Sequence, residues 1–186
     1  MKPIYTILKI LFIGIVLFGC DVSKDKKIKE ELKAFYGEVI TFGDIEIIPF
    51  NLPDSTSLSD YINARQSIIV YIDSMMLCPY CWAKYLNFWS DKIATIENSN
   101  TKVMAIFNTE NITKVRKEIS MYNIDIPFFF DISGAIKRST KAFPKMESLK
   151  TFLVRDGNVV LIGSPVGNEH MMMLYEQEAK SLGQNL

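Results

Sequence analysis

Two of the three cysteines in this 186-residue chain lie three positions apart, in the stretch Cys78-Pro79-Tyr80-Cys81. Thiols at this spacing can close into a disulfide and open again by thiol–disulfide exchange. A structural zinc site takes four ligands, and apart from Cys20 the chain adds only His170 to the pair. The motif therefore predicts a redox-active pair rather than a structural metal site, with two unrelated buried cysteines as the remaining alternative.

The residues on either side of the motif predict the elements that position it. The run 67–72 (Ser-Ile-Ile-Val-Tyr-Ile) is short and rich in β-branched residues, which is typical of a strand buried on both faces. After the motif, apolar residues recur every three or four positions, which predicts a helix with one apolar face: Trp82, Tyr85, Leu86, Trp89, Ile93 and Ile96. Cys78 is then expected near the N-cap, with Pro79 at the first helical position.

This placement predicts different roles for the two cysteines. At a helix N-terminus, unpaired backbone N–H groups and the positive end of the helix dipole stabilise a thiolate. We therefore expect Cys78 to be acidic, exposed and nucleophilic, and Cys81 to resolve the mixed disulfide that Cys78 forms. Asp73, at the end of the preceding strand, is a candidate to accept a proton from Cys81 through a water; the alternative is that it ends the strand or caps the next turn.

The first twenty residues have the layout of a secretory signal. Lys2 and Lys9 precede the apolar run 10–18, which is too short to span a bilayer comfortably. The stretch Leu17-Phe18-Gly19-Cys20 resembles the lipobox of bacterial lipoproteins, in which the cysteine becomes the lipidated first residue. This resemblance implies that residues 1–19 are removed and Cys20 is lipidated. An uncleaved membrane anchor is the alternative, and it also leaves the domain outside the cytoplasm.

The charge balance gives no indication of a nucleic-acid partner. Removal of residues 1–19 lowers the number of basic residues from 21 to 19 against 21 acidic ones, a net charge of −2. A nucleic-acid-binding domain would need a strongly basic face. The lysines near the start of the mature chain are better explained as a solvated tether, residues 20–36, which ends in a short helix containing Ile28, Leu32 and Phe35.

The rest of the chain, residues 37–186, predicts one domain of alternating strands and helices. Strands are expected at 38–42 and 45–50, as a hairpin or as edge strands with Gly43-Asp44 between them, and at 102–107, 126–130, 151–154 and 159–162. Helices are expected at 58–64, after Asn111, at 133–143 and after Asn168. Arg155-Asp156-Gly157-Asn158 predicts a tight hairpin turn. Right-handed crossovers followed by this hairpin predict an α/β three-layer sandwich with a mixed central sheet.

This order, with the CxxC motif after the first central strand, resembles the thioredoxin fold from about Ile45 to the C-terminus. The lipobox, the stretch Tyr71-Ile72-Asp73-Ser74 and the stretch 152–157 (Phe-Leu-Val-Arg-Asp-Gly) more narrowly resemble thioredoxin-like lipoproteins of bacterial envelopes. The resemblance implies thiol–disulfide exchange with envelope proteins, an unidentified redox partner, no cofactor, and a lipid-anchored domain facing the periplasm. The chain departs from the family at the cis-proline before the hairpin strand, where it has Leu149.

The resemblance also implies which residues surround the sulfurs. Pro79, Tyr80, Trp82 and Leu149 are expected at the rim of the site, with a core position as the alternative for Trp82. Two alternative functions are a non-catalytic adaptor and a copper-binding module. The second alternative would use the cysteines with soft or imidazole ligands from Met75, Met76 and residues 170–173 (His-Met-Met-Met), although packing explains these methionines more simply.

Overall fold

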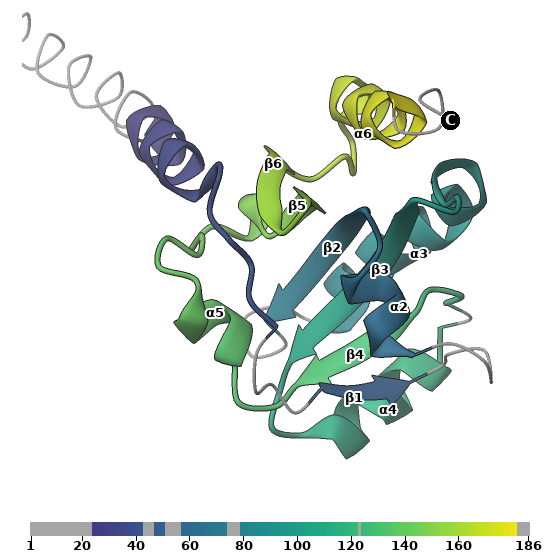
Figure 1. The fold of residues 1–186 in the computed structure, drawn as a ribbon. Helices are drawn as coiled ribbons and strands as arrows, with labels where there is room; N and C mark the ends of the chain where they lie inside the picture. Colours follow the sequence, from purple (N-terminus) through teal and green to yellow (C-terminus); the bar gives the residue numbers. More distant parts are fainter. Residues whose placement is uncertain (1–23, 43–46, 51–56, 74–78, 123, 182–186) are drawn as a thin grey trace, which may run out of the picture.

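The computed structural model describes residues 24–42, 47–50, 57–73, 79–122 and 124–181 (Figure 1). The predicted signal segment 1–19, Cys20 and Cys78 lie outside these residues. A helix over residues 24–35 precedes the labelled elements. These elements are β1 (Ile47–Phe50), α2 (Leu58–Ile62), β2 (Gln66–Asp73), α3 (Pro79–Ile96), β3 (Thr101–Asn108), α4 (Ile112–Ser120), β4 (Phe128–Asp131), α5 (Ala135–Ser139), the 3-10 helix η1 (Glu147–Leu149), β5 (Thr151–Arg155), β6 (Asn158–Ile162) and α6 (Glu169–Ser181).

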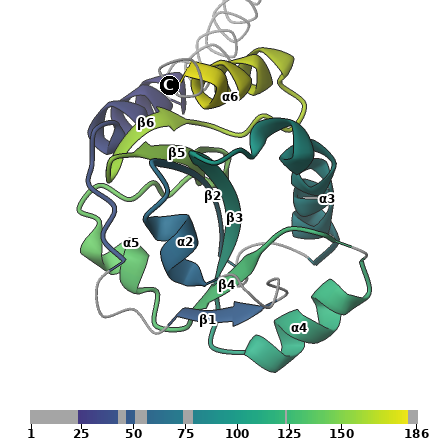
Figure 2. The ribbon, with the colours of Figure 1, turned by 45° about the vertical axis from the view of Figure 1, so that its right-hand side comes forward.

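The described strands form one mixed sheet in the order β1-β4-β3-β2-β5-β6. The central pairs β2–β3 and β3–β4 are parallel, whereas β1–β4, β2–β5 and β5–β6 are antiparallel. Figure 2 shows α3 and α4 on one side of the sheet and α2 and α5 on the other. The predicted three-layer α/β/α sandwich with a mixed central sheet is therefore confirmed.

The two faces of the sheet bury two separate hydrophobic clusters. Alternate side chains of β2 divide between them, because successive residues of a strand point to opposite faces. Ile68, Val70 and Ile72 pack with α3, α4 and α6, and Ile69 and Tyr71 pack with α2, α5 and the helix 24–35. The strand β2 is thus buried on both faces, as its unbroken apolar sequence predicts.

The segments before β2 occupy both edges of the sheet rather than forming a hairpin with each other. Val39 forms an isolated bridge with Asn158 of β6, whereas β1, which contains Pro49, pairs with β4 at the opposite edge. The core explains the first contact, because Phe35 is fully buried and brings the chain that follows it alongside β6. The expected hairpin is therefore wrong, the alternative of an edge strand holds for β1, and the turn Gly43-Asp44 lies outside the described residues.

The predicted helix caps Asn111 and Asn168 and the predicted hairpin turn are found in the structure. The Asn111 side chain accepts a hydrogen bond from the Lys114 N–H, and that of Asn168 accepts one from the Met171 N–H. At the hairpin turn, Asp156 and Gly157 both have positive φ, as a tight two-residue turn requires. The helix expected at 133–143 is shorter than predicted and ends with α5, because Thr140 has an extended backbone.

Glu97, which follows α3, gives a prediction about stability and pH. Its carboxylate accepts a hydrogen bond from the Val103 N–H at 2.8 Å, and burial raises its pKa above the ordinary value. Between the ordinary pKa and the folded pKa the native state binds more protons than the unfolded chain, so the free energy of unfolding falls as the pH rises through this window. Glu97→Gln keeps the acceptor and removes the charge.

We expect Glu97→Gln to raise the midpoint of thermal unfolding at pH 7, and this gain to vanish below the ordinary glutamate pKa. Thermal unfolding followed by circular dichroism from pH 4 to pH 8 measures both effects. Asp91→Asn, an exposed change on α3, is the matched control and should leave the midpoint nearly unchanged. A Glu97→Gln protein that melts below the wild type at pH 7 would contradict the prediction.

Candidate functional site

Cys81 lies in the first turn of α3, exposed to solvent and disulfide-bonded. The helix begins at Pro79, as predicted, so Cys81 is its third residue. The backbone N–H groups of a first turn have no partners within the helix, and the helix dipole is positive at this end. Cys81 therefore lies at the positive end of the helix, with its sulfur in a disulfide that solvent can reach.

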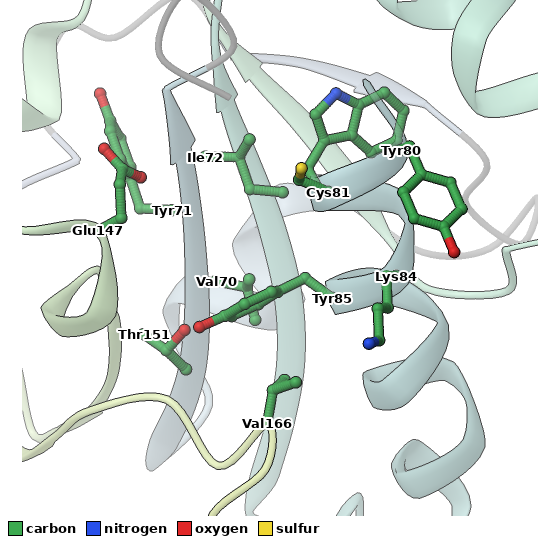
Figure 3. Close-up of a pocket in the computed structure, with 11 residues that line it drawn as sticks. Val70, Tyr71, Ile72, Tyr80, Cys81, Lys84, Tyr85, Glu147, Thr151 and Val166 are labelled. Atoms are coloured by element: carbon green, nitrogen blue, oxygen red, sulfur yellow. The ribbon is translucent and has the colours of Figure 1, made fainter. Parts of the chain in front are cut away.

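A cavity of about 410 Å³ lies beside Cys81 (Figure 3). Its walls come from the end of β2, the first turns of α3 and the segments that flank β5 and β6: Val70, Tyr71, Ile72, Tyr80, Cys81, Trp82, Lys84, Tyr85, Glu147, Thr151 and Val166. Most of these side chains are apolar or aromatic, and two carry charge. We call this cavity the Cys81 pocket. Its volume lies in the range of sites that hold a small molecule or one large side chain.

Two aromatic residues beside Cys81 have opposite environments. Tyr80 is 70% exposed, whereas Trp82 is 1% exposed. The Trp82 ring packs edge-on against Phe107 at 5.3 Å and Tyr122 at 6.0 Å between ring centroids. Trp82 therefore takes the core position that the sequence left as its alternative, and its ring also closes one side of the Cys81 pocket.

The wall of the pocket that faces α3 is formed by residues just before β5 and by the first residue of β5. Glu147 and Thr151 line the pocket, whereas Leu149 between them is buried in the cluster on the other face of the sheet. The Tyr71 N–H donates to the Lys150 carbonyl at 2.9 Å, which fastens this wall to β2. Within the described residues no peptide bond is cis.

Solved structures resemble this arrangement, although no protein-family model and no curated protein sequence matches the chain. A putative thiol:disulfide interchange protein DsbE from Chlorobium tepidum is 17% identical, with a TM-score of 0.51 over 77% of this chain and 96% of that one. A cysteine-to-serine mutant of PrxQ from Xylella fastidiosa is 13% identical, with a TM-score of 0.53 over 79% and 96%. A thiol-disulfide isomerase from Corynebacterium glutamicum is 15% identical, with a TM-score of 0.50 over 74% and 95%. The fold is thioredoxin-like.

In this thioredoxin-like chain, Asp73 lies on the face of the sheet opposite α3. Along β2 it alternates with Ile72, which packs toward α3, and shares its face with Tyr71. Its buried carboxylate lies 3.2 Å from the Lys137 Nζ and 4.0 Å from the Lys150 Nζ. The structure therefore places Asp73 beside two lysines, and its proton-transfer role stays a prediction.

Tyr71 contributes a neutral hydroxyl near the same charges. Burial, followed by the nearby carboxylate of Asp131, raises the pKa of Tyr71 above its ordinary value, so the phenol stays protonated at physiological pH. Its hydroxyl donates to the Asp131 Oδ2 at 3.4 Å. Tyr71 therefore adds no charge of its own beside Asp73 and Asp131.

Several residues that line the Cys81 pocket were not identified from the sequence. Tyr85 lies one helical turn after Cys81, and Figure 3 shows its ring extending across the pocket toward Thr151. Helical spacing from Cys81 is a signal that could have identified Tyr85. No local signal marks Glu147, Thr151 or Val166, because their position depends on how β5 and β6 pair with the sheet.

The residues of the copper alternative that the structure describes differ in their exposure to solvent. His170 is exposed at the start of α6, Met172 is buried in the core and Met173 is exposed. Within the described ranges, no three His, Cys, Asp or Glu side chains are grouped closely enough to hold a metal ion. Met75 and Met76 lie outside those ranges.

Among the helices in the described part of the chain, none combines the length and the apolar composition that crossing a membrane requires.

Proposed function

We propose that this protein is a thiol–disulfide oxidoreductase whose redox-active pair is Cys78 and Cys81. The observation that carries the proposal is the position of Cys81, which is exposed and disulfide-bonded in the first turn of α3, beside an apolar pocket. The thioredoxin-like fold supports it, because thiol-disulfide interchange proteins are among the solved structures that share this architecture.

The proposed reaction moves two electrons from the protein to a substrate disulfide. The Cys78 thiolate attacks one substrate sulfur, forms a mixed disulfide and releases the other substrate sulfur as a thiolate, which takes up a proton. The Cys81 thiolate then attacks the Cys78 sulfur and releases the second substrate thiolate. The protein is left with the Cys78–Cys81 disulfide and the substrate with two thiols. The reverse sequence oxidises a substrate dithiol, and the reduction potential of the pair sets the direction.

We further propose that the substrates are proteins of the bacterial cell envelope. The lipobox-like stretch that ends at Cys20 supports a lipid-anchored protein whose domain faces the periplasm. Envelope proteins carry disulfides, since this compartment is oxidising. The Cys81 pocket, which is mostly apolar, suits an apolar side chain next to a substrate cysteine. A redox partner in the membrane or the periplasm has to return the pair to its starting state.

The rate of alkylation tests the proposal most directly. The reduced protein is treated with iodoacetamide from pH 4 to pH 10, and mass spectrometry follows modification at Cys78. We expect a midpoint below about 8.5, the pKa of a free cysteine, together with reduction of insulin by the wild type. A midpoint at or above that of free cysteine, with no insulin reduction, would contradict the proposal and favour a non-catalytic adaptor.

A further inference from the structure

The pocket wall that faces α3 is anchored to the N-terminal helix by one carboxylate. Glu31, in the helix 24–35, accepts hydrogen bonds at its Oε2 from the Lys145 N–H at 3.1 Å and the Met146 N–H at 3.2 Å. These two residues directly precede η1, whose Glu147 lines the Cys81 pocket. An ionised acceptor makes stronger hydrogen bonds with backbone N–H groups than a neutral one does. Glu31 therefore fixes the point at which the wall begins.

The N-terminal helix is itself held firmly against the domain. Phe35, at its end, is fully buried and packs edge-on against Phe152 of β5 at 5.0 Å and Phe143 at 5.7 Å between ring centroids. Because Phe35 is fixed in the core, the helix gives Glu31 a defined position from which to bind the wall. This helix is thus packed into the same hydrophobic cluster as Leu149.

The other end of the wall is anchored by a buried lysine. Lys150 is 3% exposed, and its Nζ forms an ion pair with the Glu147 carboxylate and lies 4.0 Å from the Asp73 Oδ2. The same Asp73 oxygen also pairs with Lys137, so Lys150 is one member of a charge network at the end of β2. A buried charge needs such partners, because it has lost its water. Lys150 therefore ties the pocket residue Glu147 to the strand that leads into the CxxC motif.

Between these anchors the wall has little structure of its own. It contains one three-residue 3-10 helix, a kind of element with strained hydrogen bonds that is stable only in short pieces. The Leu149 N–H donates to the Met146 carbonyl, the Lys150 N–H to the Glu147 carbonyl, and the Ser148 carbonyl accepts from the Ser164 N–H. These bonds are local, so the position of the whole wall, and of the Glu147 side chain that lines the pocket, depends on the two anchors.

We propose that Glu31 and Lys150 are positioning residues for substrate binding, so that the N-terminal helix supports the wall of the substrate site and is not only a tether. This inference rests on the proposed function, and it concerns binding rather than the chemistry of the sulfurs. The acidity of the thiols depends on the first turn of α3, which neither residue contacts in any hydrogen bond or ion pair described above. Loss of an anchor should therefore raise KM and leave kcat and the alkylation midpoint unchanged.

The first test compares Glu31→Ala with Glu30→Ala in the full-length protein, with insulin as the disulfide substrate and dithiothreitol as the electron donor. Glu30 is exposed on the same helix and lies 4.0 Å from Lys26, which makes it a matched control. We expect Glu31→Ala to raise KM about tenfold, because it removes both hydrogen bonds that the carboxylate accepts from the wall, and Glu30→Ala to leave KM unchanged. Glu31→Gln, which keeps an acceptor oxygen, should restore part of the loss.

The second test applies the same comparison to the buried lysine. Lys150→Met keeps the length of the side chain and removes its charge, and Lys145→Met removes a charge from an exposed residue of the same segment. We expect KM to rise for Lys150→Met alone. Thermal unfolding verifies that each variant is folded. If Lys150→Met does not fold, the comparison of Glu31→Ala with Glu30→Ala decides whether the anchored wall determines KM.

Hydrogen exchange separates failure of this inference from failure of the proposed function. The amides of Lys145 and Met146 donate to Glu31, so Glu31→Ala should accelerate their exchange in NMR spectra while Glu30→Ala does not. Unchanged exchange, or equal KM values for the two variants, overturns the inference. If the wild type reduces no insulin, both the proposed function and the inferred role of Glu31 in substrate binding are overturned. Faster exchange in Glu31→Ala would in that case still show that Glu31 holds the wall in place.

Discussion

Cys81→Ser is expected to reduce turnover to the background rate and to trap covalent complexes between Cys78 and substrate proteins. The first step, attack by the Cys78 thiolate on a substrate disulfide, does not need Cys81. The second step does, since serine cannot displace a sulfur at neutral pH, and the mixed disulfide then has no resolving thiol. Non-reducing gels of membranes that contain the variant should show high-molecular-weight species that disappear on reduction.

The control for this trap is the variant in which both cysteines are replaced. Cys78→Ser combined with Cys81→Ser has no attacking thiol in the motif and should trap nothing, and it leaves the proposed lipidation site Cys20 unchanged. Mass spectrometry of the trapped species should place the bond at Cys78. Full turnover by Cys81→Ser, or equal trapping by the double variant, would contradict both the proposed reaction and the role of Cys81 in it.

Trp82→Ala is expected to lower the free energy of unfolding by about 3–5 kcal/mol, the usual cost of removing a buried Trp side chain. Its ring fills the space between α3 and the sheet, with edge-on contacts to Phe107 and Tyr122. Because domains of this size unfold with roughly 5–15 kcal/mol, the loss would remove a large part of the stability. Urea denaturation followed by circular dichroism measures it.

Tyr80→Ala is the matched control, because Tyr80 is an aromatic residue of the same motif that is 70% exposed. We expect it to change the free energy of unfolding by no more than about 0.5 kcal/mol. Similar losses for the two variants would mean that Trp82 does not hold the core position described here. Tyr80 lines the Cys81 pocket, so Tyr80→Ala is expected to change substrate binding more than it changes stability.

The fold was predictable from the sequence because its central elements carry strong local signals. The unbroken apolar run of β2 and the three phenylalanines of β4 require burial on both faces, and they lie in both clusters. Pro79 followed by an apolar residue every three or four positions fixed the start of α3. Gly157 and Asn158 after Asp156 fixed the last hairpin. Each of these signals depends on residues a few positions apart.

The rest could not be predicted, because it depends on contacts between distant parts of the chain. Glu31 contacts residues more than one hundred positions away in the chain. Lys150, just before β5, contacts Asp73 at the end of the neighbouring strand β2. The sequence placed Asp73 at the end of a strand, but periodicity alone does not tell which face of that strand α3 covers. The same limit explains the hairpin that was expected around Gly43, since two short apolar runs give no indication that they pair at opposite edges of the sheet.

The occupation of both sheet edges by the N-terminal part of the chain has a consequence for self-association. At one margin the backbone groups of Gly157 and Val159 are paired with residues 37–40, and at the other the outermost strand contains Pro49, which has no N–H to offer. Along the described parts of these two edges, a second molecule therefore finds no long unbroken row of free donors and acceptors to which it could add strands. Such edges protect a sheet protein against the growth of fibres by strand addition.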